Sequence, residues 1–74
     1  MVSIFQKQYE CINGNIAAIL AKRKMSVETL SRRSGISKST LYQRRKDTNK
    51  YSLEELLLIS RALGVSVSDL LKEC

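Results

Sequence analysis

The sequence predicts an all-α fold, a compact domain of five helices. Apolar residues recur at steps of three and four along the chain, which is the spacing of helices with one buried face. The chain contains no proline, and serines and glycines stand where helices are expected to begin and end. Its 74 residues are enough for one hydrophobic core, so a single domain is expected.

The expected helix boundaries follow from the positions of these serines and glycines. A serine directly before a helical pattern can accept a hydrogen bond from an N–H group of the first turn. Four such serines are present: Ser26, Ser37, Ser52 and Ser66. Gly35 and Gly64 stand at expected helix ends, where a left-handed conformation is needed. The expected helices are a first one that starts between Gln6 and Asn15 and ends at Arg23, and then Val27–Ser34, Lys38–Arg45, Leu53–Leu63 and Val67–Glu73.

The domain proper is assigned to residues 12–74, and residues 1–11 are either an N-terminal extension or the start of the first helix. Ser52 has Glu55 three positions later, and Ser66 has Asp69 in the same place. This spacing is typical of a capping box, in which serine and acid each bind the backbone of the other.

The net charge of +6 is concentrated in the middle of the chain. Residues 22–50 hold ten basic side chains against two acidic ones, a local net charge of +8. The other residues hold three basic and five acidic side chains and sum to −2. A basic stripe on a small domain is typical of a protein that binds a polyanion.

Several classes of protein are excluded or disfavoured. The longest apolar runs have five or six residues, far short of the roughly 20 that cross a bilayer, so no membrane partner is expected. The first residues lack an export signal, and the expected location is the cytoplasm. There is no histidine, which removes Cys/His zinc sites and histidine-dependent catalysis. We therefore expect no cofactor, no metal and no enzymatic activity, with Cys11 and Cys74 as free thiols.

The second and third expected helices fit a helix-turn-helix. Leu30, Ile36 and Leu41 can lock the two helices together as one body. Gly35 stands in the tight turn, and Ser31 is small where the two helices must cross. All of these requirements are met in one register.

From about Ile12 to Leu71 the chain resembles the lambda-type phage repressors and Cro proteins, also called XRE-type regulators. The resemblance rests on three segments: Met25-Ser26, the run from Leu30 to Leu41, and the closing run from Ser52 through Ala62-Leu63-Gly64-Val65-Ser66. It implies a five-helix lambda-repressor-like domain of phage or bacterial origin. It further implies a transcriptional repressor that binds a palindromic operator as a dimer.

The chain departs from this family at three places. Val27 stands where the family commonly has a glutamine that holds a DNA phosphate, and Ser31 replaces the usual alanine. The third helix ends in Arg44-Arg45 instead of an apolar residue and a glutamate. Arg44 is expected either to pack its aliphatic stem against Leu41 with its head in solvent, or to end the helix differently.

With Leu41 facing inward, the outer face of the third helix carries hydrogen-bonding groups. Gln43 can pair bidentately with adenine, and Tyr42 can contact a thymine methyl or a phosphate unless it is a half-buried core aromatic. The resemblance supports base reading at Lys38, Ser39 and Gln43. The predicted base-reading residues are Lys38, Ser39, Tyr42 and Gln43, and the predicted phosphate contacts are Ser37, Arg45, Lys46, Asn49 and Lys50.

A second patch is predicted on the fourth and fifth helices. Leu57 lies at the border of the expected inner face of its helix, and Leu58 points nearly opposite to that face. Together with Leu71 they could form a two-fold dimer interface, although scattered surface apolar residues are an equally good interpretation. A homodimer would place two recognition helices one DNA turn apart, roughly 34 Å.

These observations predict a sequence-specific regulator that binds double-stranded DNA. One alternative is a protein-interaction module of the antitoxin or phage-modulator type, whose main partner is another protein. That alternative predicts weak DNA binding that responds little to salt. A third hypothesis is binding to anionic surfaces by charge alone, which predicts steep salt dependence and no sequence preference.

Overall fold

The computed structural model describes residues 6–73, with the side chains of residues 10–48 and 50–73. Over this range all regular structure is helical, which confirms the all-α prediction. The elements are α1 (Gln6–Arg23), α2 (Val27–Ser34), α3 (Lys38–Lys46), the short 3-10 turn η1 (Thr48–Lys50), α4 (Leu53–Leu63) and α5 (Val67–Leu70).

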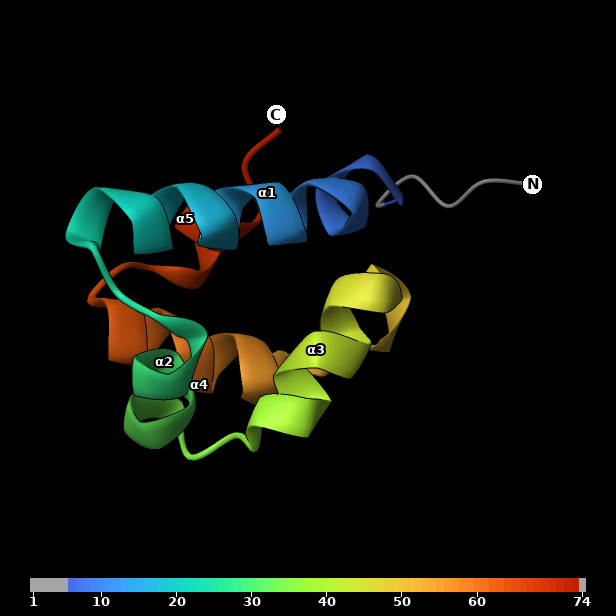
Figure 1. Ribbon diagram of the computed structural model, residues 1–74. Coiled ribbons are helices and arrows are strands. Elements are labelled where there is room, and N and C mark those ends of the chain that lie inside the picture. The colour runs from blue at the N-terminus through green and yellow to red at the C-terminus, as the bar shows by residue number, and fades with distance from the viewer. Residues whose placement is uncertain (1–5, 74) are drawn as a thin grey trace.

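The five helices enclose one core. α1 lies across one side of the molecule and packs against η1 and α5 (Figure 1). α2 packs against both α3 and α4, and α4 continues into α5, which returns to α1. This arrangement leaves α3 at one edge of the molecule, with its outer side free of other helices (Figure 1).

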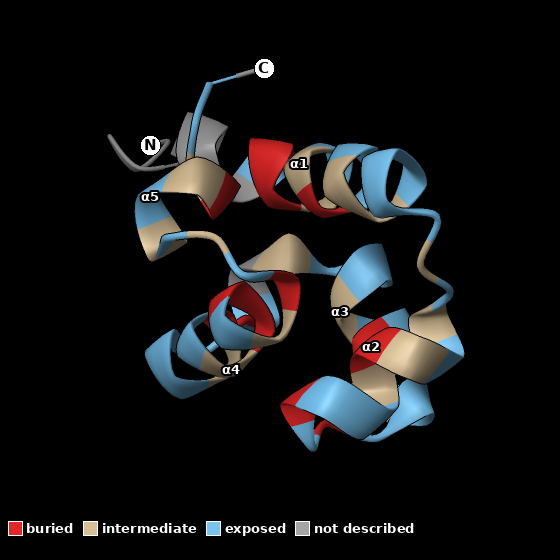
Figure 2. Ribbon diagram, turned by 90° about the vertical axis from the view of Figure 1, so that its left-hand side faces the viewer, coloured by how far each residue is buried: buried red, intermediate tan, exposed pale blue. Residues whose placement is uncertain are grey.

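Apolar side chains from all five helices, including Leu41 of α3, meet in the centre. Ile12 from α1, Leu30 from α2, Ile59 and Leu63 from α4, and Leu70 from α5 are almost completely buried. Figure 2 shows the buried positions on the inner sides of the helices and the exposed positions outside. Burying a side chain of this size contributes about 1.5–3 kcal/mol, so this cluster is the main source of stability.

The serine caps predicted from the sequence are confirmed. Each of the four serines has an extended conformation and accepts a hydrogen bond from the N–H group three residues later. Ser52 with Glu55 and Ser66 with Asp69 form complete capping boxes. Gly35 ends α2 in the left-handed region, with φ of 77°. The chain can turn sharply there because glycine has no Cβ.

α1 begins at Gln6, at the early limit of the predicted range, and runs through Gly14 without a break. It ends at Arg23 and is followed by Lys24, a non-glycine residue with φ of 53°. The Met25 N–H donates to the Leu20 carbonyl at 2.9 Å, which closes the last turn. The chain thus adopts a left-handed residue here without a glycine, a conformation that costs about 1–2 kcal/mol.

α2 and α4 have the predicted limits, whereas α3 and α5 differ from the prediction at their C-terminal ends. α3 extends one residue further, to Lys46, and η1 forms a single 3-10 turn between α3 and α4. α5 ends at Leu70, so the helix predicted through Glu73 is wrong. The Asn15 side-chain amide donates to the Leu70 carbonyl at 2.7 Å and to the Lys72 carbonyl at 2.9 Å. These bonds hold the chain in a non-helical path.

Two further findings concern the cysteines and the possibility of a membrane span. Cys11 is buried in α1 and forms a disulfide, so the free thiol expected there is wrong. That expectation rested on an assumed reducing compartment rather than on geometry, and Cys74 lies outside the described residues. Among residues 6–73, no helix combines the length and apolar character needed to span a membrane.

Candidate nucleic-acid interface

The turn between α2 and α3 is braced by two serine hydroxyls. The Gly35 N–H donates to the Ser31 carbonyl at 2.9 Å. The Ser31 hydroxyl donates to the Ile36 carbonyl at 2.6 Å, and the Ile36 N–H donates to the Ser34 hydroxyl at 3.2 Å. The sequence required a small residue at position 31 but did not reveal this hydrogen bond. The one feature of the sequence that could have indicated this bond is the serine at position 31, where the family usually has alanine.

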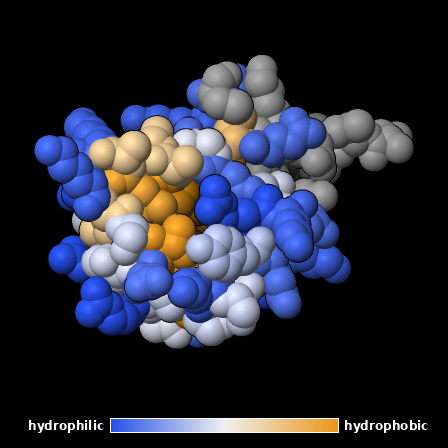
Figure 3. All heavy atoms as spheres, in the orientation of Figure 1, coloured by the Kyte–Doolittle hydropathy of each residue, from blue (hydrophilic) through white to orange (hydrophobic). Residues whose placement is uncertain are grey.

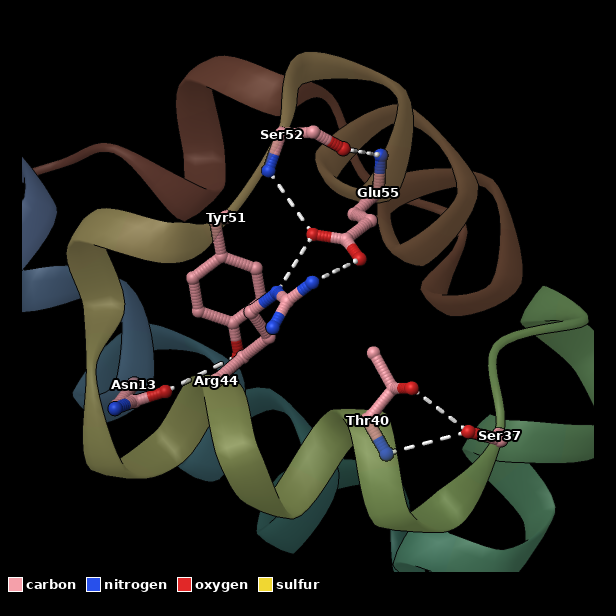
Figure 4. A network of polar contacts seen from close by, with 7 residues as sticks. All are labelled: Asn13, Ser37, Thr40, Arg44, Tyr51, Ser52 and Glu55. Carbon is pink, nitrogen blue, oxygen red and sulfur yellow. Dashed lines mark hydrogen bonds and ion pairs between the residues drawn. The ribbon is translucent and has the colours of Figure 1, made fainter.

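α3 begins at Lys38 because Ser37 caps it. The Thr40 N–H donates to the Ser37 hydroxyl at 3.2 Å, and that hydroxyl donates to Thr40 Oγ1 at 2.8 Å (Figure 4). The single hydroxyl proton of Ser37 is therefore directed at a neighbouring side chain. A phosphate contact by Ser37 would need that proton to turn outward, and it stays a prediction.

The outer face of α3 is accessible along its whole length. Leu41 is the only buried residue of this helix. The four predicted base-reading residues, Lys38, Ser39, Tyr42 and Gln43, are all exposed. The helix thus presents a cation, a hydroxyl, a phenol and an amide in one direction, and these groups match the donors and acceptors of base edges.

Tyr42 lies on the surface, with 46% of its area exposed. The interpretation of Tyr42 as a half-buried core aromatic is wrong. The guanidinium carbon of Arg45 lies 6.0 Å from the centroid of its ring, at the outer limit of a cation–π contact. The buried tyrosine is Tyr51 instead.

Lys38 forms an ion pair at the N-terminal end of α3. Its Nζ lies 3.2 Å from Glu28 Oε1, which joins α3 to the first turn of α2. The two side chains are 48% and 73% exposed. An ion pair this open to water contributes little to stability. It can therefore be exchanged for another anion at low cost.

Most basic side chains of the central segment are accessible to solvent. Nine of the ten basic side chains between positions 22 and 50 are exposed, and the exception is Arg44. Of the predicted phosphate contacts, Arg45, Lys46 and Lys50 are exposed, whereas the side chain of Asn49 is outside the described part of the chain. The structure thus leaves the positive charge available to a polyanion.

Arg44 faces inward and holds Glu55 on α4 (Figure 4). Its Nε donates to Glu55 Oε1 at 2.9 Å and its Nη2 donates to Oε2 at 3.1 Å. Neither outcome expected for Arg44 is correct, because α3 stays helical and the guanidinium head is paired rather than solvated. The hydrogen bond from Arg44 lowers the pKa of Glu55, and the hydrogen bond to Glu55 raises the pKa of Arg44.

Tyr51 fills the space between this pair and α1. Its hydroxyl donates to Asn13 Oδ1 at 3.2 Å (Figure 4). The Asn13 amide in turn donates to the Arg45 carbonyl at 2.7 Å. Burial of the ring raises the pKa of Tyr51 to about 12. The end of α3 is therefore bonded to α1 as well as to α4.

An apolar hollow of about 210 Å³ lies beside α3. Residues from α1, α2 and α3 line it, among them Ala17, Leu20, Val27 and Leu41, with Arg45 at its edge. Figure 3 shows this apolar surface surrounded by hydrophilic side chains. Val27, which replaces the phosphate-holding glutamine of the family, therefore contributes to an apolar surface.

The patch predicted on α4 and α5 is only partly formed. Leu57 is exposed, but Leu58 and Leu71 are half-buried against the core, so the expectation that Leu58 points into solvent is wrong. α4 packs against both α2 and α5 and thus buries more than one stripe. Leu53, one turn before Leu57, is the most exposed large apolar residue of the described chain and was missed.

The helix-turn-helix, its accessible outer helix and the exposed positive charge define a DNA-binding protein. A family model described as the Cro/C1-type HTH DNA-binding domain matches residues 15–72. The chain belongs to this family, and the resemblance to Cro and XRE-type regulators is confirmed. No curated protein and no solved structure matches the chain.

Proposed function

We propose that this protein is a transcriptional repressor that binds a palindromic operator as a homodimer, with α3 in the major groove. The proposal rests on one observation above others: Leu41 is the one buried residue of α3, and four side chains able to contact bases are exposed on the same helix. On this proposal the protein acts in the cytoplasm, on the nucleoid.

We assign base reading to Lys38, Ser39, Tyr42 and Gln43. The Gln43 amide suits the N6 and N7 positions of adenine, and Lys38 suits a guanine or a phosphate once it leaves Glu28. Tyr42 is exposed enough for its ring to reach a thymine methyl group. These contacts specify sequence, whereas contacts to phosphate only position the protein.

We assign phosphate contacts to the basic side chains at the end of α3 and in η1. Arg45 and Lys46 are exposed in the last turn of α3, and Lys50 is exposed at the end of η1. Asn49 and Ser37 are the other proposed contacts. These groups neutralise phosphates and release counterions, which makes binding dependent on salt.

We propose that α4 carries the dimer contact. Leu53 and Leu57 are both exposed and lie one helical turn apart, so they form one apolar stripe. Leu71, half-buried and directly after the end of α5, can extend it. A two-fold axis through this surface would repeat α3 one DNA turn away, at roughly 34 Å, which is why a palindromic operator is expected.

The same stripe supports a second candidate function. Leu53 and Leu57 could instead contact a different protein, as in an antitoxin or phage modulator. The two candidates differ in their dependence on DNA. A modulator would bind DNA weakly and would need its partner for full activity.

Selection of bound sequences from a random DNA pool, at two salt concentrations, tests the proposal. A palindromic consensus that persists at the higher salt concentration supports it, and sedimentation of the complex should give two protein chains per site. Recovery of DNA without any consensus would contradict sequence-specific binding. A non-palindromic consensus bound by one chain would contradict the dimer alone.

Replacement of Gln43 by alanine tests the base-reading face. Selection should then return a relaxed preference at one position of each half-site, with a loss of about 1–3 kcal/mol on the original site. Unchanged affinity together with unchanged preference would show that α3 presents another face to the bases.

Replacement of Lys50 by alanine tests the phosphate contacts. Affinity for all sequences should fall to a similar extent, and the slope of log affinity against log salt should decrease by roughly one. Titrations of operator and unrelated DNA at several salt concentrations measure both effects. A loss confined to the operator would instead assign Lys50 to base reading.

A further inference from the structure

α3 is weakly held by apolar contacts. Leu41 is its single buried residue, near the middle of a helix of nine residues. Its backbone lies close to α2 and η1, whereas α1 and α4 are reached mainly through side chains. A short helix with one apolar anchor can tilt about that point, so other contacts must set its direction.

The two ends of α3 are held in different ways. The N-terminal end follows the braced turn at Ile36 and is covalently close to α2. The C-terminal end is held by polar contacts on two sides. Arg44 binds Glu55 through two parallel hydrogen bonds, and the Arg45 carbonyl accepts from Asn13.

The Arg44 contact is suited to fix a direction. Two parallel hydrogen bonds between a planar guanidinium and a carboxylate define an orientation as well as a distance. Glu55 is itself immobilised, because its Oε1 also accepts the Ser52 N–H at 3.0 Å in the capping box of α4. The two side chains are 23% and 17% exposed, so water competes little for these bonds.

We infer that Arg44 is a positioning residue for DNA recognition: its bidentate bond to Glu55 ties the C-terminal end of α3 to the start of α4 and sets the tilt at which α3 presents its outer face. This inference rests on the proposed function, since it concerns sequence readout by α3. Arg44 differs from the neighbouring basic residues because its guanidinium is bound within the protein.

The first test uses the free protein. Residual dipolar couplings of the backbone amides report the orientation of each helix. In the unmodified chain the couplings of α3, α2 and α4 should fit one rigid alignment. In Arg44→Met and Glu55→Gln the couplings of α3 alone should depart from that fit. Arg61→Met, which removes an exposed arginine from α4, is the control and should leave the fit intact.

The second test measures DNA binding at a temperature where circular dichroism shows every variant folded. The readout is the affinity for the best selected sequence divided by that for unrelated DNA. Arg44→Met and Glu55→Gln should each lower this ratio about tenfold, with little change for unrelated DNA. The double variant should show no further loss, because the two groups act as one contact. Arg44→Lys keeps the charge but not the planar guanidinium, so its affinity ratio should lie between those of the unmodified chain and Arg44→Met.

Three outcomes would overturn the inference. One is an α3 orientation in Arg44→Met equal to that of the unmodified chain. The second is a loss of thermal stability in both variants with an unchanged ratio, which would show a merely stabilising pair. The third is a salt slope reduced in Arg44→Met, which would show that Arg44 contacts phosphate. If the unmodified chain shows no sequence preference, the proposed function fails, and the dipolar couplings still decide whether Arg44 sets the tilt.

Discussion

The two ion pairs of α3 link it to neighbouring helices in contrasting ways. Lys38 meets Glu28 through one oxygen at 3.2 Å, in an open position at the start of α3. Arg44 meets Glu55 through both oxygens near the end of α3, where less than a quarter of either side chain is exposed. The same kind of charge therefore has different surroundings at the two ends of one helix.

The difference separates two uses of a basic residue in a DNA-binding helix. An exposed, single contact is easily replaced, so Lys38 can leave Glu28 for a base or a phosphate. A partly buried, bidentate contact loses more when broken, because the remaining charge is left without a partner. Net charge alone counts both residues equally, although only one of them is available to DNA.

The largest expected effect comes from removing the apolar anchor that lies between the two pairs. Leu41→Ala should lower the free energy of unfolding by about 2–5 kcal/mol, since it leaves a cavity in the core beside α2. Urea denaturation followed by circular dichroism measures this change. Arg61→Ala, which truncates an exposed side chain on α4, is the control and should change stability little. Similar losses in the two variants would show that α3 is held chiefly by polar contacts.

An intermediate effect is expected from pH. Because the hydrogen bond from Arg44 lowers the pKa of Glu55, the pair stabilises the fold above the ordinary pKa of glutamate. This contribution is lost as the pH falls through the lowered value. At pH 7, Glu55→Gln should reduce Tm by about 5 °C, and this difference should shrink in acid.

Thermal melts of both proteins between pH 7 and pH 3 measure this effect. The capping carboxylate of Asp69 also has a lowered pKa, through the Ser66 N–H, so both proteins should still lose stability in acid. A Tm difference that stays constant over this range would contradict the assigned linkage.

The smallest effect is expected at the open pair. Glu28→Gln releases Lys38 and should change Tm by less than about 3 °C. Affinity for DNA should rise about threefold at low salt, and this gain should vanish at high salt, where exposed charges are screened. Glu54→Gln, the same charge change on α4, is the control. An equal gain in both variants would indicate a general charge effect rather than release of Lys38.

Much of the fold could be predicted because it depends on local chemistry. The serine caps, the glycine ends and the spacing of apolar residues gave α2 and α4 with their exact limits. The C-terminal ends of α3 and α5 were harder to predict from the sequence. Asn15 captures the carbonyl of Leu70 from a position 55 residues away, and no local signal announces such a bond.

The outward face of α3 was also predictable, since Ser39 and Gln43 are each two positions from the buried Leu41 and therefore lie about 160° away from it on a helix of normal pitch. The exposure of these residues agrees with that prediction, and their contacts to DNA stay predictions. The exposed stripe on α4 was not predicted correctly. A helical wheel assumes one buried face, whereas α4 has neighbours on two sides.

By itself, the sequence determined the helices, the turn at Gly35 and the concentration of positive charge near α3, because these properties depend on residues close together in the chain. Only the tertiary structure decided which charges are available. It paired Lys38 loosely with Glu28 and Arg44 firmly with Glu55, eleven positions further along. The physical reason is that burial and hydrogen-bond geometry arise only when separate helices meet, and they determine whether a charged side chain binds DNA or holds the helix that does.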